Sequence, residues 1–217
     1  DVGAGPHRRC CETAAHAQWL ESTIDLPYTY DSGPRSLCWN SINNKVYCAN
    51  WLGDNVTVID GANNSIITST AVGDGPYDVC WTSTNNKIYC ANYWSGNVTV
   101  INGVTDSVIA TVSCGIGPRA LCWNETNNKI YCANWISDDV TIIDAEHDSV
   151  VATVPAGDSP YTIYWDSLNN KIYCANYYSN NIRVIDGASN SVINTTPVGV
   201  HPCALVYNPT NNKIYCA

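Results

Sequence analysis

The segment Asn43-Asn44-Lys45-Val46-Tyr47-Cys48-Ala49-Asn50 recurs along this chain of 217 residues. Close copies occupy residues 85–92, 127–134 and 169–176, and a shortened copy occupies residues 211–217. The lysine of each copy lies 42 residues after the previous one, at Lys45, Lys87, Lys129, Lys171 and Lys213. This constant spacing indicates repeated structural units with no insertion or deletion between them.

Each repeat contains four short segments of strand-forming residues, separated by residues that favour turns. In the first repeat the expected strands are residues 37–39, 46–50, 55–60 and 65–72, and residues 40–44 form a hairpin in which Asn suits the left-handed backbone. Sets of four strands at a period near 40 residues predict a β-propeller. The expected fold is therefore all-β: a five-bladed β-propeller of 42-residue four-stranded repeats.

Ring closure is the open question of this prediction. Residues 1–21 do not follow the repeat, residues 22–217 form the expected propeller domain, and the fifth blade has its first two strands at 205–207 and 213–217. The N-terminal segment completes this last blade, with residues 22–30 as its outer strand, or a neighbouring subunit supplies the missing strand and builds a filament. Both alternatives stay open.

Composition restricts the partners and the compartment. The net charge is -9 and Arg8-Arg9 is the single basic cluster, which excludes nucleic acid as an expected partner. No apolar run reaches the roughly 20 residues that span a membrane. The absence of Met suggests a removed signal peptide, and twelve cysteines favour an oxidising compartment, so we expect an extracellular protein. Five sequons are candidate glycosylation sites: Asn55, Asn63, Asn97, Asn124 and Asn194.

Six cysteines occur as pairs ten residues apart on the two strands of one hairpin. If the two members share a face of the sheet, they can form disulfides within a blade: Cys38–Cys48, Cys80–Cys90 and Cys122–Cys132. Bridges between neighbouring blades fit the same count, and buried free thiols are a third reading. The other six cysteines are candidates for bonds between subunits: Cys10, Cys11, Cys114, Cys174, Cys203 and Cys216.

The unit Tyr207-Asn208-Pro209-Thr210-Asn211-Asn212-Lys213-Ile214-Tyr215 resembles the YVTN family of β-propeller repeats. The resemblance covers about residues 22–217, and the chain departs from the family by having Cys where the family has Val. The family is common in surface-layer and cell-envelope proteins of archaea and bacteria. The resemblance therefore implies a propeller at the cell surface.

The loops that follow each second strand, together with the crossovers between blades, form the face on which propellers usually bind ligands. Aromatic rings there can stack on the apolar faces of sugars, or they can pack loops together and form a subunit interface. The candidate residues are Trp51, Tyr93, Trp94, Trp135, Tyr177 and Tyr178, with Arg35, Tyr77, Arg119 and Tyr161 on the crossovers. A second aromatic set, on the first strands, is expected in the core: Trp39, Trp81, Trp123, Trp165 and Tyr207.

No metal site, cofactor or catalytic residue is predicted, because the chain has no Cys-x-x-Cys or paired His spacing. His147 and His201 depart from their repeats, but no nucleophile is evidently aimed at them. The first functional hypothesis is an extracellular structural or adhesive protein that self-assembles as a homo-oligomer or polymer. A multivalent glycan-binding propeller is the alternative, and a lactonase-like hydrolase is the third.

Overall fold

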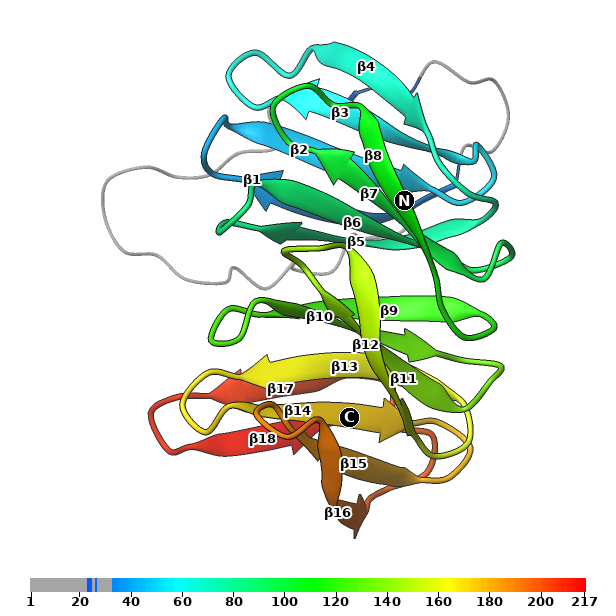
Figure 1. Ribbon diagram of the computed structural model, residues 1–217, viewed down its shortest axis with the longest axis vertical. Helices are drawn as coiled ribbons and strands as arrows, with labels where there is room; N and C mark the ends of the chain where they lie inside the picture. The colour runs from blue at the N-terminus through cyan, green and yellow to red at the C-terminus, as the bar shows by residue number, and fades with distance from the viewer. Residues whose placement is uncertain (1–22, 25, 27–32) are drawn as a thin grey trace, which may run out of the picture.

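The computed structural model describes residues 23, 24, 26 and 33–217, and the regular elements of this part are all β-strands. Four antiparallel sheets of four strands are followed by a two-stranded hairpin (Figure 1). Blade one contains β1 (Pro34–Asn40), β2 (Lys45–Asn50), β3 (Asn55–Asp60) and β4 (Ile66–Ala71). Blade two contains β5 (Pro76–Thr82), β6 (Lys87–Asn92), β7 (Asn97–Asn102) and β8 (Val108–Ser113).

The remaining blades repeat this order. Blade three contains β9 (Pro118–Asn124), β10 (Lys129–Asn134), β11 (Asp139–Asp144) and β12 (Ser149–Pro155). Blade four contains β13 (Pro160–Asp166), β14 (Lys171–Asn176), β15 (Asn181–Asp186) and β16 (Ser191–Pro197), and blade five contains β17 (Leu205–Asn208) and β18 (Lys213–Cys216). The prediction of an all-β propeller with 42-residue blades is confirmed.

Local turn chemistry explains why the strands end where they do. Asn44, the last residue of the first hairpin turn, has a φ of 55°, which Asn tolerates better than most residues. After β3, the Asp60 carboxylate accepts a hydrogen bond from the Ala62 amide at 2.7 Å, which fixes the next turn. The left-handed Asn of the hairpin turn and the side-chain acceptor after the third strand both recur in the following blades.

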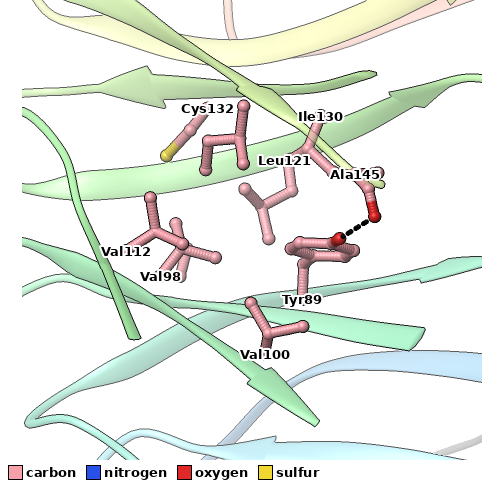
Figure 2. Close-up of a cluster of buried hydrophobic side chains, with 10 residues drawn as sticks. Tyr89, Val98, Val100, Val112, Leu121, Ile130, Cys132 and Ala145 are labelled. Atoms are coloured by element: carbon pink, nitrogen blue, oxygen red, sulfur yellow. Dashed lines mark hydrogen bonds between the residues drawn. The ribbon is translucent and has the colours of Figure 1, made fainter. Parts of the chain in front are cut away.

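The first strand of each blade packs beside the first strand of the next, so β1, β5, β9, β13 and β17 follow one another in space. Figure 1 shows blade one at one end of the long axis and blades four and five at the other. The hydrophobic core lies between successive blades, where the two facing sheets bury each other. Figure 2 shows the core between blades two and three, with Tyr89, Val98 and Val100 facing Leu121, Ile130 and Cys132.

A polar latch also joins successive blades. The Tyr47 hydroxyl donates to one carboxylate oxygen of Asp106 at 2.7 Å, and the Lys45 ammonium contacts the other oxygen at 2.6 Å. Asp106 lies in the turn between β7 and β8, so the second strand of one blade is tied to the outer turn of the next. The repeat reproduces this latch twice, with Lys87 and Tyr89 on Asp148 and with Lys129 and Tyr131 on Asn190.

The two end blades differ from the inner ones. Trp39 of blade one is 58% exposed, whereas its equivalents Trp81, Trp123 and Trp165 pack against the cores between blades. The prediction of a core position is therefore wrong for Trp39, because no described blade covers that face of blade one. Tyr207 at the other end is half-buried. The predicted closing segments, the N-terminal residues 1–21 and the outer strand 22–30, fall almost wholly outside the described residues.

Candidate functional site

The crossover face of the molecule consists of the loops between the second and third strands together with the segments that cross between blades. The Trp51 amide donates to the Gly33 carbonyl at 2.9 Å, and the Tyr93 amide donates to the Gly75 carbonyl at 2.8 Å. Trp135 and Tyr177 are held in the same way in the next two blades. These backbone bonds place the predicted aromatic residues beside the crossovers.

At the centre of this face the crossovers surround a cavity of about 270 Å³. Four blades contribute one long side chain each, at the same position of the repeat: Arg35, Tyr77, Arg119 and Tyr161. Cys203 of blade five occupies the fifth position. We call the cavity with these five residues the mouth.

Arginine and aromatic rings alternate around the mouth. The guanidinium carbons of Arg35 and Arg119 each lie 4.5 Å from the ring centre of Tyr77, so this ring lies between two cations. Arg119 also lies 3.7 Å from the ring centre of Tyr161 and 4.9 Å from that of Trp135. Such contacts fix the guanidinium groups while leaving their N–H edges free to bind a ligand.

Among the residues that the structure describes, the one carboxylate that lines the mouth belongs to Asp78. Its oxygens accept hydrogen bonds from the Ser36 hydroxyl at 2.6 Å, from the Leu121 amide at 2.8 Å and from the Val79 amide at 2.9 Å. Burial raises the pKa of Asp78, and these hydrogen bonds oppose that rise. Asp78 therefore joins the first strands of three blades rather than neutralising an arginine.

An apolar rim lies on the loops of the same face, where Trp94 contacts Trp51 and Tyr178 contacts Trp135. It consists of four exposed side chains at one loop position in successive blades: Leu52, Trp94, Ile136 and Tyr178. Trp94 is 65% exposed and Tyr178 is 56% exposed, whereas Trp51, Trp135 and Tyr177 are half-buried in aromatic contacts with their neighbours. Of the predicted ligand-binding aromatics, Trp94 and Tyr178 present the most surface to a partner.

The mouth also contains features that the sequence reasoning missed. Asp78 was one, although it is the single acidic residue at its position in the five repeats. A second is an alternation over two blades, or 84 residues, in which odd blades carry Arg and Trp where even blades carry Tyr and Tyr. The pairs are Arg35 with Arg119, Trp51 with Trp135, Tyr77 with Tyr161 and Tyr93 with Tyr177.

The predicted disulfides within blades are wrong. All ten described cysteines are free thiols, including all members of the pairs Cys38–Cys48, Cys80–Cys90 and Cys122–Cys132. In the first hairpin Cys38 lies opposite Tyr47, and Cys48 lies opposite Leu37. Opposite residues share a face of the sheet, so Cys38 and Cys48 point to different faces. The same register holds in blades two and three.

The cysteines are distributed over the cores between blades. Cys38 and Cys90 contact one core cluster, Cys80 and Cys132 the next, and Cys122 and Cys174 the third. Burial raises the pKa of Cys174 to about 12, so its thiol stays protonated and unreactive at neutral pH.

Cys174 is fully buried, which contradicts its predicted role in a bond between subunits. Cys203 and Cys216 are exposed and Cys114 is half-buried. Cys10 and Cys11 lie outside the described residues.

Two of the five sequons are buried. The Asn124 amide nitrogen donates to the Asn170 side chain at 2.7 Å, and the Asn55 amide nitrogen donates to the Gly53 carbonyl at 2.5 Å. A glycan on either nitrogen would break these bonds and would not fit the packing, so the predictions for Asn55 and Asn124 are wrong. Asn97 is half-buried, and Asn63 and Asn194 are exposed.

The two unusual histidines lie apart. His147 is exposed and contacts the Asp144 carboxylate at 3.2 Å, whereas the His201 ring stacks on Tyr177 with centres 4.3 Å apart. Within the described ranges, no three His, Cys, Asp or Glu side chains are grouped as metal ligands. In the same ranges, no helix has the length and apolar character needed to cross a membrane.

Repeated four-stranded blades around a central mouth define this protein as a β-propeller. A family model described as the YNCE-like beta-propeller matches residues 31–216, and the chain belongs to that family. Comparison with curated protein sequences gives no match.

Among solved structures, the chain is similar to Kuenenia stuttgartiensis hydrazine synthase, with a TM-score of 0.75 and 19% sequence identity. The match covers 89% of this chain and 57% of that one. At this level of identity the likeness supports the fold alone.

Proposed function

We propose that this chain is an adhesive binding propeller that attaches to carbohydrate through its crossover face and works outside the cell. The observation that carries the proposal is the apolar rim: four exposed side chains at one loop position lie on the same face as a cavity lined by arginine and tyrosine. Exposed apolar side chains grouped around a pocket are typical of binding surfaces. The resemblance to YVTN repeats supports the location at the cell surface.

Carbohydrate suits this surface better than a purely apolar partner. Sugars present flat C–H faces that pack on Trp and Tyr rings, and hydroxyl groups that need polar partners nearby. Trp94 and Tyr178 offer such rings at the rim, and the mouth supplies the polar groups.

Glycan-array binding of the full chain tests this proposal. Trp94→Ala and Tyr178→Ala should each weaken glycan binding by up to about tenfold, because the loss of one stacked ring costs about 0.5–1.5 kcal/mol. Ile42→Ala and Leu168→Ala are matched controls, because these exposed residues lie in hairpin turns at the opposite ends of the strands. Equal losses in all four variants, or no glycan bound by the parent chain, would refute the proposal.

Self-assembly is the second candidate, favoured by the two end blades. Leu37 and Trp39 are exposed on blade one, and Val206 and Tyr215 are exposed on blade five. Their equivalents in the inner blades face each other across the blade interfaces, so the two end faces are the two halves of one repeated contact. A second copy of this chain fits that contact head to tail.

Light scattering after size-exclusion chromatography tests self-assembly. We expect the mass to rise with protein concentration, and we expect Trp39→Glu and Tyr215→Glu to abolish the rise. A constant monomer mass up to high concentration would contradict this second candidate. Reductant should have no effect on the assembly, because the contact uses apolar faces rather than disulfides.

A further inference from the structure

We propose that the mouth binds the carboxylate of an acidic saccharide, such as a uronic acid, and that Arg35 and Arg119 are the residues that hold it. This inference rests on the carbohydrate-binding function proposed above and names the ligand class of the same site. It also gives a role to the arginines, which the apolar rim does not explain.

The first argument is that, within the part of the chain that the structure describes, neither arginine of the mouth has an acidic partner in an ion pair. Among the described residues the ion pairs are Lys45–Asp106, Lys87–Asp148 and His147–Asp144, and neither Arg35 nor Arg119 takes part in one. The Asp78 carboxylate lines the same cavity but is occupied by three other donors. Counted over the described residues, the mouth therefore has two arginines and one carboxylate in a chain whose net charge is -9.

The second argument is an unsatisfied donor. The Nε atom of Arg119 is buried and has no hydrogen-bond acceptor, although the guanidinium group is fixed between the rings of Tyr77 and Tyr161. A ligand oxygen that reaches this group would supply the missing acceptor. A carboxylate fits best, because its two oxygens match the fork of N–H groups that a guanidinium presents.

The third argument concerns the rest of the ligand. The cavity of about 270 Å³ is slightly smaller than usual ligand pockets, which span roughly 300–1,000 Å³, so it admits one small ring rather than a long chain. Tyr77 and Tyr161 line its wall, and Trp94 and Tyr178 of the rim offer rings to the next units. A saccharide with a carboxylate on one ring satisfies the cations and the aromatic surfaces together.

The net charge argues against a polyanion. A long, densely charged anionic chain would be repelled by a protein with a net charge of -9. A short saccharide brings its carboxylate close to the mouth and not to the rest of the acidic surface. We therefore expect short acidic oligosaccharides to bind in preference to nucleic acid or heparin-like chains.

The test is calorimetric titration of the full chain with trigalacturonate and with its methyl ester, which has the same backbone without the charges. Trigalacturonate should bind at least tenfold more tightly than the ester. Arg35→Gln and Arg119→Gln should each remove this preference. Arg183→Gln is the matched control and should leave it unchanged, because Arg183 lies on β15 and donates to the Pro155 carbonyl.

The outcomes separate this inference from the proposed function. Equal binding of the ester, unchanged binding in Arg35→Gln and Arg119→Gln, or no binding of trigalacturonate would overturn the acidic-saccharide site. If a neutral glycan then still bound in a way that depends on Trp94 and Tyr178, the proposed function would stand without it. Inorganic phosphate that competed as well as trigalacturonate would show a simple anion site and would overturn the saccharide class. A circular dichroism melt of each variant confirms its folding.

Discussion

Asp148 is the acceptor of the latch between blades two and three, and its replacement tests how the blades are held together. The carboxylate contacts the Lys87 ammonium at 2.8 Å and the Tyr89 hydroxyl at 2.7 Å, and the Lys87 and Asp148 side chains are 12% and 14% exposed. Removing one partner of a buried ion pair costs about 3–5 kcal/mol. We expect Asp148→Gly to lower the free energy of unfolding by this amount. Glycine is the suitable replacement because Asp148 has a φ of 51°.

The repeat itself suggests the milder variant. Blade four carries Asn190 at this position, where it accepts Lys129 at 3.0 Å and Tyr131 at 3.3 Å. Asp148→Asn should therefore keep both partners, which then share its single oxygen as they do at Asn190, and lose the negative charge of the acceptor. Charge-assisted bonds contribute about 1.5–3 kcal/mol and neutral ones about 0.5–1.5, so the expected loss is about 2 kcal/mol.

Urea denaturation followed by tryptophan fluorescence at pH 7 measures both losses. Glu146→Ala is the control: this exposed residue lies in the same turn, and its loss should change the free energy by less than about 0.5 kcal/mol. The account of the latch fails if Asp148→Asn and Asp148→Gly are equally destabilising, or if neither differs from Glu146→Ala.

Three further predictions concern packing, pH and thiols. A Cβ on Gly103 would approach the Asn86 side-chain oxygen to 2.6 Å and the Asn40 side-chain nitrogen to 2.9 Å, so Gly103→Ala should destabilise the fold. Adding Asn40→Thr should recover part of the loss, because the next repeat pairs Thr82 with Ala145, and a double-mutant denaturation cycle measures the coupling. Burial raises the pKa of Asp78, so the folded state holds its proton to higher pH than the unfolded state. Stability should therefore fall as pH rises just above about 4, and denaturation at a series of pH values should show this fall abolished in Asp78→Asn. Ellman titration of the unfolded chain, prepared without reductant, should detect at least ten thiols, whereas three disulfides within blades would leave no more than six.

Much of the fold was predictable because one chemical pattern repeats without interruption. The strands, the left-handed Asn44 turn and the hydrogen bond by which Asp60 fixes the next turn follow from residue types at a constant period. The exposure of Trp39 was not predictable in this way, because a repeat pattern describes inner blades and Trp39 belongs to the first described blade.

The disulfide error has a simple cause. Opposite residues in the first hairpin are separated by odd numbers, as Asn40 and Lys45 are by five and Cys38 and Tyr47 by nine. Cysteines ten residues apart therefore cannot face each other in this register. The length of the hairpin turn sets this register and excludes these disulfides. The prediction of disulfides relied on the number of cysteines alone.

The candidate site was predicted in position but not in character. The sequence placed Arg35, Arg119 and the loop aromatics on one face, and the structure brings them around one mouth. The stacking of both arginines on Tyr77 depends on distances across blades, which no local pattern encodes. Asp78 was not predicted because the interpretation relied on residues that the repeats share. Asp78 is the single acidic residue at its position in the repeat.

A crystal structure of the chain in complex with trigalacturonate would test the central claim most directly. The account predicts one galacturonate ring in the mouth, with its carboxylate oxygens about 3 Å from nitrogen atoms of Arg35 and Arg119 and a neighbouring ring against Trp94 or Tyr178. A ligand bound elsewhere on the chain, or a mouth that stays empty at saturating ligand, would contradict it.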